Sequence, residues 1–174
     1  MKYLTSVALL LLTAFSLAQE GMMDMTPPKE MEQISWLAGE WECKKLVMHW
    51  EGQTTETTGK TSSKMILNGR YLQSMNTYEM PGMGQMSGVF MVTYNPGTKM
   101  WVGHWFDSTA PEAMVLTGPL ENNKLTLTSK AAEMMPEMRS VYEKVGDGVK
   151  FLLEMKQGET WAPLMEGTFT KVGL

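Results

Sequence analysis

The sequence predicts an all-β protein, folded as a single up-and-down antiparallel β-barrel of about 8–10 strands with a short N-terminal helical turn. Three observations predict this class. Strand-like segments follow one another along most of the chain. Their spacing is typical of an all-β sandwich or barrel. The tight-turn sequences between them fall at every second connection.

The first residues have the pattern of a secretory signal. Lys2 precedes an apolar run over residues 4–15, and Ser16 and Ala18 supply the small residues that a signal peptidase reads. We expect cleavage near Ala18 and a secreted or periplasmic protein; an N-terminal membrane anchor is the alternative. We therefore divide the chain into a signal peptide (1–18), a flexible lead-in (19–32) and a barrel domain (33–174). The rest of the chain has no apolar run long enough for a membrane span.

The elements follow in order after the lead-in. Residues 30–37 are expected to form one or two helical turns, with Ile34, Trp36 and Leu37 on the apolar side and Gly39 just beyond the end. The predicted strands are 40–50, 57–67, 70–78, 85–94, 99–107, 113–117, 124–129, 138–145, 149–155 and 164–171.

The turns suggest which end of the barrel is open. Asn68-Gly69 is a strong hairpin signal, because both central residues of the turn need a positive φ. Three further tight turns are predicted at 95–97, 122–123 and 146–148. In a meander these four lie at one end, and the longer connections 51–56, 79–84, 108–112, 130–137 and 157–163 lie at the other. A barrel closed at one end and rimmed by loops at the other is suited to holding a ligand.

Composition excludes several function classes. The net charge of −4 argues against non-specific nucleic-acid binding, which needs a basic surface. The single cysteine, Cys43, permits no internal disulfide and no multi-cysteine zinc site, and we expect it to be buried and inert. No glycine pattern for phosphate binding precedes a helix.

Gly39-x-Trp41, at the start of the first strand after a helical turn, resembles the calycin superfamily of lipocalins and relatives. The downstream residues resemble the bacterial family called domain of unknown function 1579, which is taken to be calycin-like; they are 67–72 (Leu-Asn-Gly-Arg-Tyr-Leu), Gly88, Tyr94-Asn95, Trp101 and Trp105-Phe106-Asp107-Ser108. This resemblance implies a barrel with Gly39 and Trp41 as its structural floor. Lys171 stands where an arginine is expected near the end of the last strand. The family carries no established activity, so no catalytic residue is transferred.

Methionine is the most unusual feature of the composition, with 19 residues. Two clusters fall on predicted loops at the open end: Met80, Met83 and Met86, then Met134, Met135 and Met138. Thioether sulfur is a soft ligand that selects copper(I), so these six residues form a candidate metal site. Methionine is also an adaptable apolar filler, common at promiscuous ligand-binding surfaces.

The histidines and tryptophans supply candidate pocket residues. His49 shares strand parity with Trp41 and Cys43, so it is expected to point inward. His104 points inward only if the Met100–Phe106 face of its strand is the inner one, and both faces are apolar. An inward histidine could ligate haem iron, although a hydrogen-bonded wall histidine is the simpler interpretation. Trp105 and Trp161 lie near the loop-rich end and are candidate pocket residues.

Acid–base chemistry has weaker support. Asp107 and Glu112 flank one loop, and Arg70 or His104 could complete an acid–base group, but no spacing specifies this. Asp107 could equally cap the turn that follows it.

The sequence therefore predicts non-catalytic binding of a small apolar ligand, without a cofactor. The candidate ligand-binding residues are His49, Arg70, His104, Trp105, Asp107 and Trp161. Two alternatives remain: a periplasmic copper(I) carrier that uses the methionines, and a solidly packed barrel that serves as a structural or interaction module.

Overall fold

The computed structural model describes residues 26–173, except for 51, 81, 83 and 133–134. The expected signal peptide and most of the lead-in lie outside the described residues. Among the described helices, none has the length and apolar character needed to cross a membrane.

The ten predicted strands are confirmed within a few residues at each end. They are β1 (Gly39–Trp50), β2 (Gln53–Ile66), β3 (Tyr71–Met80), β4 (Gly84–Asn95), β5 (Met100–Asp107), β6 (Met114–Gly118), β8 (Lys124–Ser129), β9 (Met138–Val145), β10 (Gly148–Gln157) and β11 (Thr160–Lys171). One further strand, β7 (Leu120–Glu121), forms a minimal hairpin with β8 and was not expected.

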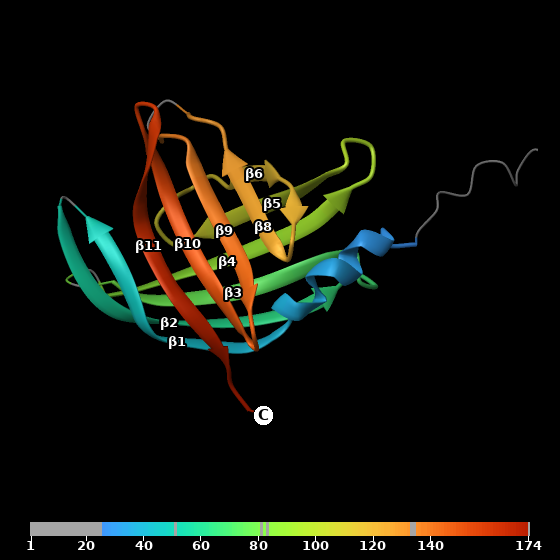
Figure 1. Cartoon of the computed structure of the whole chain (residues 1–174), viewed down its shortest axis with the longest axis horizontal. Coiled ribbons are helices and arrows are strands. Elements are labelled where there is room, and N and C mark those ends of the chain that lie inside the picture. Colours follow the sequence, from blue (N-terminus) through green and yellow to red (C-terminus); the bar gives the residue numbers. More distant parts are fainter. Residues whose placement is uncertain (1–25, 51, 81, 83, 133–134, 174) are drawn as a thin grey trace, which may run out of the picture.

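The strands form one closed antiparallel barrel (Figure 1). Their order around the sheet is β6-β5-β4-β3-β2-β1-β11-β10-β9-β8-β7, and a pairing between β6 and β8 closes the ring. This closing pairing is short, since it joins only Leu116 to Ser129 and Thr117 to Thr128. The predicted up-and-down barrel is therefore confirmed.

The two ends of the barrel differ, although less in loop length than we expected. At the open end, β1 and β2 are separated by residues 51–52, β3 and β4 by residues 81–83, and β10 and β11 by residues 158–159, so three predicted long loops are short connections. The threonine-rich segment after Trp50 reads as polar but suits a strand, because threonine is β-branched. The longer connections at this end are 108–113 and 130–137.

Two β-bulges change which side chains face the interior. In β1, Cys43 pairs with Gly59 of β2 and Leu46 pairs with Thr57. Two residues of β1 therefore lie between these pairs, where β2 has only one, so β1 carries one extra residue. In β11, Met165 pairs with Leu153 of β10 and Pro163 pairs with Glu154. Leu164 is therefore an extra residue between two consecutive pairs. Because side chains alternate along a strand, each extra residue reverses the inward parity of the residues beyond it.

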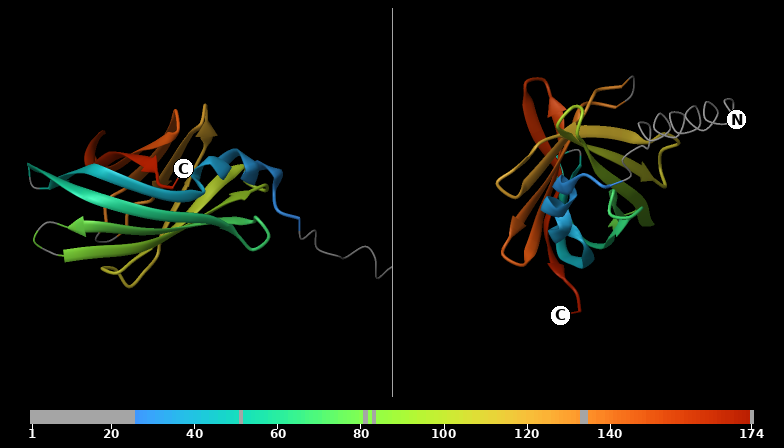
Figure 2. Two further views of the ribbon diagram at one scale, coloured as in Figure 1. Left: turned by 90° about the horizontal axis from the view of Figure 1, so that it is seen from below. Right: turned by 90° about the vertical axis from the view of Figure 1, so that its right-hand side faces the viewer.

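The closed end is covered by the 3-10 helix η1 (Lys29–Leu37), which lies across the barrel opening (Figure 2). Its buried residues are Met31, Ile34 and Leu37. A spacing of three places these side chains on one face, because a 3-10 helix has three residues per turn. Met31 therefore takes the core position that we had assigned to Trp36, which is only partly buried.

Trp41 connects the helix to the barrel. Its side chain is buried, and its indole Nε1 donates a hydrogen bond to the Leu37 carbonyl oxygen at 2.9 Å. The Lys171 ammonium lies 5.5 Å from the centre of the indole ring, in the position where an arginine was expected. Gly39 has a φ of +134°, and a Cβ there would lie 2.7 Å from Lys171 Cε. Gly39 and Trp41 thus form the floor that the sequence predicted.

Replacing Gly39 by alanine should destabilise the fold. The backbone at +134° lies outside the region open to alanine, and the new methyl group would displace Lys171 from Trp41. We expect the free energy of unfolding, measured by urea denaturation, to fall by about 2–3 kcal/mol for Gly39→Ala and by only about 1 kcal/mol for Gly158→Ala. Gly158 is a suitable control because its φ is +63° and a Cβ there would meet open space. Equal losses in the two variants would contradict this account of the floor.

Candidate functional site

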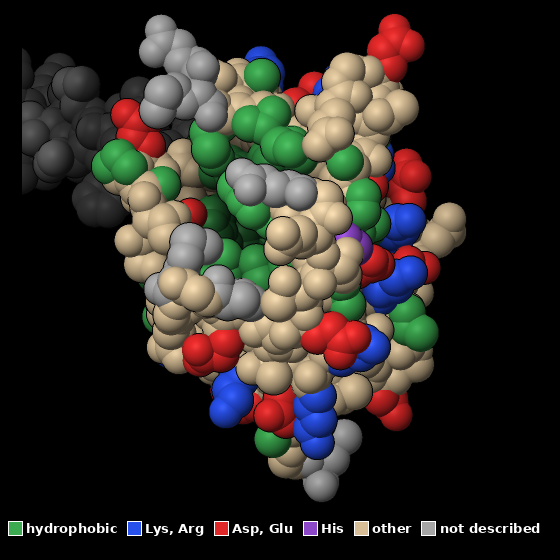
Figure 3. Space-filling model, turned by 90° about the vertical axis from the view of Figure 1, so that its left-hand side faces the viewer, with side chains coloured by type: hydrophobic (Ala, Val, Ile, Leu, Met, Phe, Trp, Pro, Cys, Tyr) green, Lys and Arg blue, Asp and Glu red, His purple; other side chains and the backbone are tan. Residues whose placement is uncertain are grey.

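The end of the barrel opposite η1 is hollowed and lined by hydrophobic side chains (Figure 3). Two adjoining cavities lie there. The mouth cavity, about 320 Å³, is lined by residues that include Trp105, Met114, Met138 and Phe151. The rim cavity, about 490 Å³, is lined by residues that include Met48, Met80 and Leu164. Trp50, Met86, Leu153 and Met165 line both.

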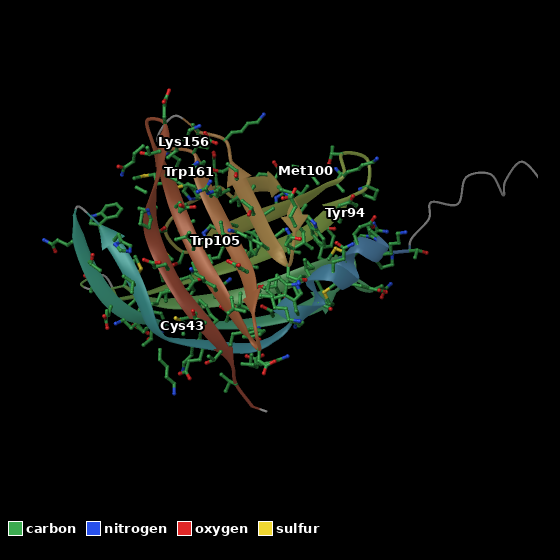
Figure 4. All side chains as sticks on the ribbon, in the orientation of Figure 1. Cys43, Tyr94, Met100, Trp105, Lys156 and Trp161 are labelled. Carbon is green, nitrogen blue, oxygen red and sulfur yellow. The ribbon has the colours of Figure 1, made fainter. Side chains whose placement is uncertain are left out.

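Trp105, a candidate ligand-binding residue, lines the mouth cavity (Figure 4). It follows Trp101 and Gly103 along the inner face of β5, which settles the orientation of that strand. The indole lies against Gly88 on β4, where an added Cβ would come within 2.3 Å of the ring. Glycine at position 88 is therefore what allows the indole to lie against the barrel wall.

Asp107 holds both Trp105 and the following turn in place. Its Oδ2 accepts a hydrogen bond from Trp105 Nε1 at 2.9 Å, and its Oδ1 accepts from the backbone N–H groups of Thr109 and Ala110 at 2.7 and 2.9 Å. The Thr109 hydroxyl donates to the same Oδ1. Burial by itself would raise the pKa of Asp107, but these hydrogen bonds outweigh it and lower the pKa. The carboxylate is thus an ionised cap of the turn.

The methionine clusters converge at the open end, as expected. Met80 and Met86 line the rim cavity, and Met86, Met135 and Met138 line the mouth cavity. Met83 and Met134 lie outside the described residues. Ala132 and Met135 form an antiparallel bridge, with backbone hydrogen bonds in both directions.

His49 does not point into the barrel, so the parity prediction was wrong. The bulge after Cys43 turns Leu46, Met48 and Trp50 inward instead. His49 Nε2 lies 3.1 Å from Glu166 Oε1 on β11, and His49 is one of the residues that line the rim cavity.

His104 and Arg70, in contrast to His49, line none of these cavities. His104 lies on the outer face of β5, opposite Val115 of β6, which is half-exposed. Arg70 follows the β2–β3 turn at the closed end, and its Nη2 donates to the Thr26 carbonyl oxygen at 2.9 Å. Neither residue can join Asp107 in an acid–base group, and neither histidine is placed to ligate haem inside the barrel.

Trp161 lies on the outside of the barrel, contrary to our expectation. The bulge in β11 places it opposite Lys156 (Figure 4). The Arg139 guanidinium lies 4.3 Å from the centre of its ring and also forms an ion pair with Glu154, with 2.6 Å between Arg139 Nε and Glu154 Oε2. Trp161 therefore shields an external ion pair and does not line the cavities.

A third, smaller cavity of about 40 Å³ lies deeper in the barrel and is called the floor cavity here. Its wall on β2 and β3 is polar. Thr61 Oγ1 donates to Asn76 Oδ1 at 2.9 Å, Ser63 Oγ donates to Ser74 Oγ at 2.8 Å, and the Tyr78 hydroxyl donates to Asn76 Oδ1 at 3.3 Å. These five residues, the polar seam, were not identified from the sequence.

The sequence did carry some signal for the residues that were missed. The apolar alternation Trp41, Cys43 resumes one residue late at Leu46, Met48, Trp50, after two consecutive lysines. Pro163 lies inside a strand, where proline is confined to edges and bulges. The polar seam had no such signal, because serine, threonine and asparagine in a strand usually face solvent.

Fold and site together define a single-domain antiparallel barrel, sealed by a helix at one end and hollow at the other. A family model described as "Protein of unknown function (DUF1579)" matches residues 26–171, and the chain belongs to this family. The crystal structure of Rv2717c from M. tuberculosis is similar, with a TM-score of 0.63 and 13% identity over 85% of this chain and 100% of that chain. At that identity the similarity supports the barrel fold alone. No curated protein matches this chain.

Replacing Asp107 by asparagine should cost stability in a pH-dependent way. The lowered pKa means that the ionised carboxylate stabilises the fold above the unfolded pKa of about 3.9, and this contribution is lost as the pH falls through the folded pKa. An asparagine side chain has only one acceptor oxygen. Its NH2 group would therefore face another donor, either the indole N–H of Trp105 or the backbone N–H groups of the turn. We expect Asp107→Asn to lower the free energy of unfolding by about 1–2 kcal/mol at neutral pH, with the difference shrinking below about pH 4. A difference that stayed constant with pH would contradict this role.

Proposed function

We propose that this protein binds a small, largely apolar ligand in the mouth cavity without catalysing a reaction on it. The observation that carries the proposal is the cavity itself, about 320 Å³ at the open end of the barrel and walled by tryptophan, methionine and phenylalanine. Ligand pockets are typically concave, mostly apolar and of a few hundred Å³. Apolar area removed from water contributes about 25 cal/mol per Å², so such a site needs no special chemistry to bind.

The arrangement of polar groups supports a binding role over a catalytic one. Asp107 is engaged by Trp105 and by the turn that it caps. Burial raises the pKa values of Tyr78 and Tyr142, so both hydroxyls stay neutral. The presence of a cavity also favours a ligand-binding barrel over a solidly packed structural module.

The expected signal peptide places this binding outside the cytoplasm, as a secreted or periplasmic protein. Cys43 suits that setting because the residue is buried, only 1% exposed, and burial raises the pKa of its thiol. A buried thiol of raised pKa reacts poorly with oxidants.

Copper(I) binding remains the second candidate, because one observation favours it. All four described methionines of the candidate metal site line the two open-end cavities, together with Met48 and Met165. The described residues contain no group of three or more histidine, cysteine, aspartate or glutamate side chains that could hold a metal ion. A metal at this end would therefore depend on thioether sulfur.

The hydrocarbon fluorophore diphenylhexatriene tests the apolar site directly. We expect it to bind the protein with one ligand per chain, and we expect Trp105→Ala to weaken this affinity by roughly tenfold, because lining area is lost. Met86→Leu is the matched control, since it keeps the side-chain volume and removes sulfur, and it should change the affinity by less than about twofold. Unchanged or tighter binding by Trp105→Ala would contradict the proposal.

Anaerobic copper(I) titration against a competing chelator distinguishes the second candidate. The comparison variant carries leucine in place of Met80, Met83 and Met86. Under the apolar-ligand proposal, wild type and variant should bind copper(I) equally weakly. Tight stoichiometric binding that disappears in the variant would instead identify a metal-handling protein and overturn the proposed function.

A further inference from the structure

The floor cavity continues the mouth cavity inward. Tyr78, Phe90, Tyr142 and Phe151 line both. Three of these rings form a row, with centroids 5.7 Å apart for Phe90 and Tyr142 and 5.2 Å apart for Tyr142 and Phe151. A ligand seated among the methionines and tryptophans of the mouth therefore meets this aromatic layer, and the polar seam begins directly behind it.

Tyr78 is the member of the polar seam that faces the ligand space. It borders both cavities, its side chain is only 6% exposed, and its hydroxyl lies 3.3 Å from Asn76 Oδ1. An O–H···O hydrogen bond usually spans about 2.7–2.8 Å, so this contact is long and weak. Asn76 Oδ1 already accepts the shorter hydrogen bond from Thr61 at 2.9 Å. The Tyr78 hydroxyl is thus a buried donor whose hydrogen bond inside the protein is long, so it can turn to a better-placed acceptor.

The charged residues around the cavities indicate which kind of ligand group could accept a hydrogen bond from Tyr78. Among the described residues that line the mouth, rim and floor cavities there is no lysine or arginine. Asp107 is the only acidic residue among them. A carboxylate or phosphate buried beside Tyr78 would have no positive partner, and an unpaired buried charge is strongly disfavoured. A neutral oxygen would instead receive the Tyr78 hydrogen bond at little desolvation cost.

We propose that Tyr78 is the polar recognition residue of the ligand site, and that the ligand is a neutral amphiphile whose hydroxyl or carbonyl oxygen accepts a hydrogen bond from Tyr78. This inference rests on the proposed function and adds to it the chemical class of the ligand. The apolar body of the ligand occupies the mouth cavity, and its single polar end points toward the floor. Asn76 and Thr61 support the site by holding the seam in place behind Tyr78.

The test compares probes with and without a polar end. Diphenylhexatriene is a pure hydrocarbon, 1-decanol carries a hydroxyl, and decanoate carries a charge; the two aliphatic compounds are measured by displacement of diphenylhexatriene. Tyr78→Phe removes only the hydroxyl, and because that hydroxyl makes only a long hydrogen bond, the variant should fold normally. Tyr94→Phe is the matched control, since Tyr94 packs edge-on against Trp101 and does not line the cavities.

We expect Tyr78→Phe to weaken 1-decanol binding by about 5- to 20-fold and to change diphenylhexatriene binding by less than about twofold. Tyr94→Phe should change neither, and wild type should bind decanoate at least about tenfold more weakly than 1-decanol. If diphenylhexatriene binds but Tyr78→Phe leaves 1-decanol binding unchanged, or decanoate binds as tightly as 1-decanol, this inference is wrong and the proposed function stands. If no probe binds wild type, both are wrong.

Discussion

Closure of the sheet into a ring is the constraint on which the rest of this structure depends. Once β6 pairs with β8, every barrel strand has a neighbour on each side, and each side chain must face either the interior or the solvent. The closing contact is short, but it turns an open apolar sheet face into a walled space. The helix η1 and Trp41 then cover one end of that space, and the mouth and rim cavities lie at the other.

The two bulges decide which side chains face the opening. Both lie in strands that meet at the open end, and each reverses the parity of the residues beyond it. The bulge in β1 brings Trp50 to the opening and moves His49 outside, while the bulge in β11 moves Trp161 outside to cover the Arg139–Glu154 ion pair. The result is an opening lined by apolar and thioether side chains, with charged and aromatic pairs on the outer wall. Bulges near sites commonly act in this way, by re-aiming side chains.

The interior changes in character along the barrel axis. Methionine and tryptophan dominate near the opening, an aromatic layer follows, and hydroxyl and amide groups lie on one wall near the floor. Flexible thioethers accommodate varied shapes, whereas a hydrogen-bonded seam holds fixed positions. The adaptable side chains thus lie near the opening, and the fixed polar groups lie near the floor.

The sequence by itself determined the strands, the turns, the barrel class and the end at which the methionines gather, because alternation and turn chemistry are local properties of consecutive residues. The family resemblance pointed to Gly39 and Trp41 at the helix-covered end, and Trp105 and Asp107 line the mouth cavity at the other. Only the tertiary structure decided which faces point inward beyond a bulge: the interrupted alternation after Cys43 and the proline at 163 mark irregular positions, but the pairing with the partner strand decides which residue is the extra one. For the same reason the polar seam could not be recognised in advance. Ser63, Ser74 and Asn76 become a buried network only because β2 and β3 lie side by side on the inner wall of a closed barrel.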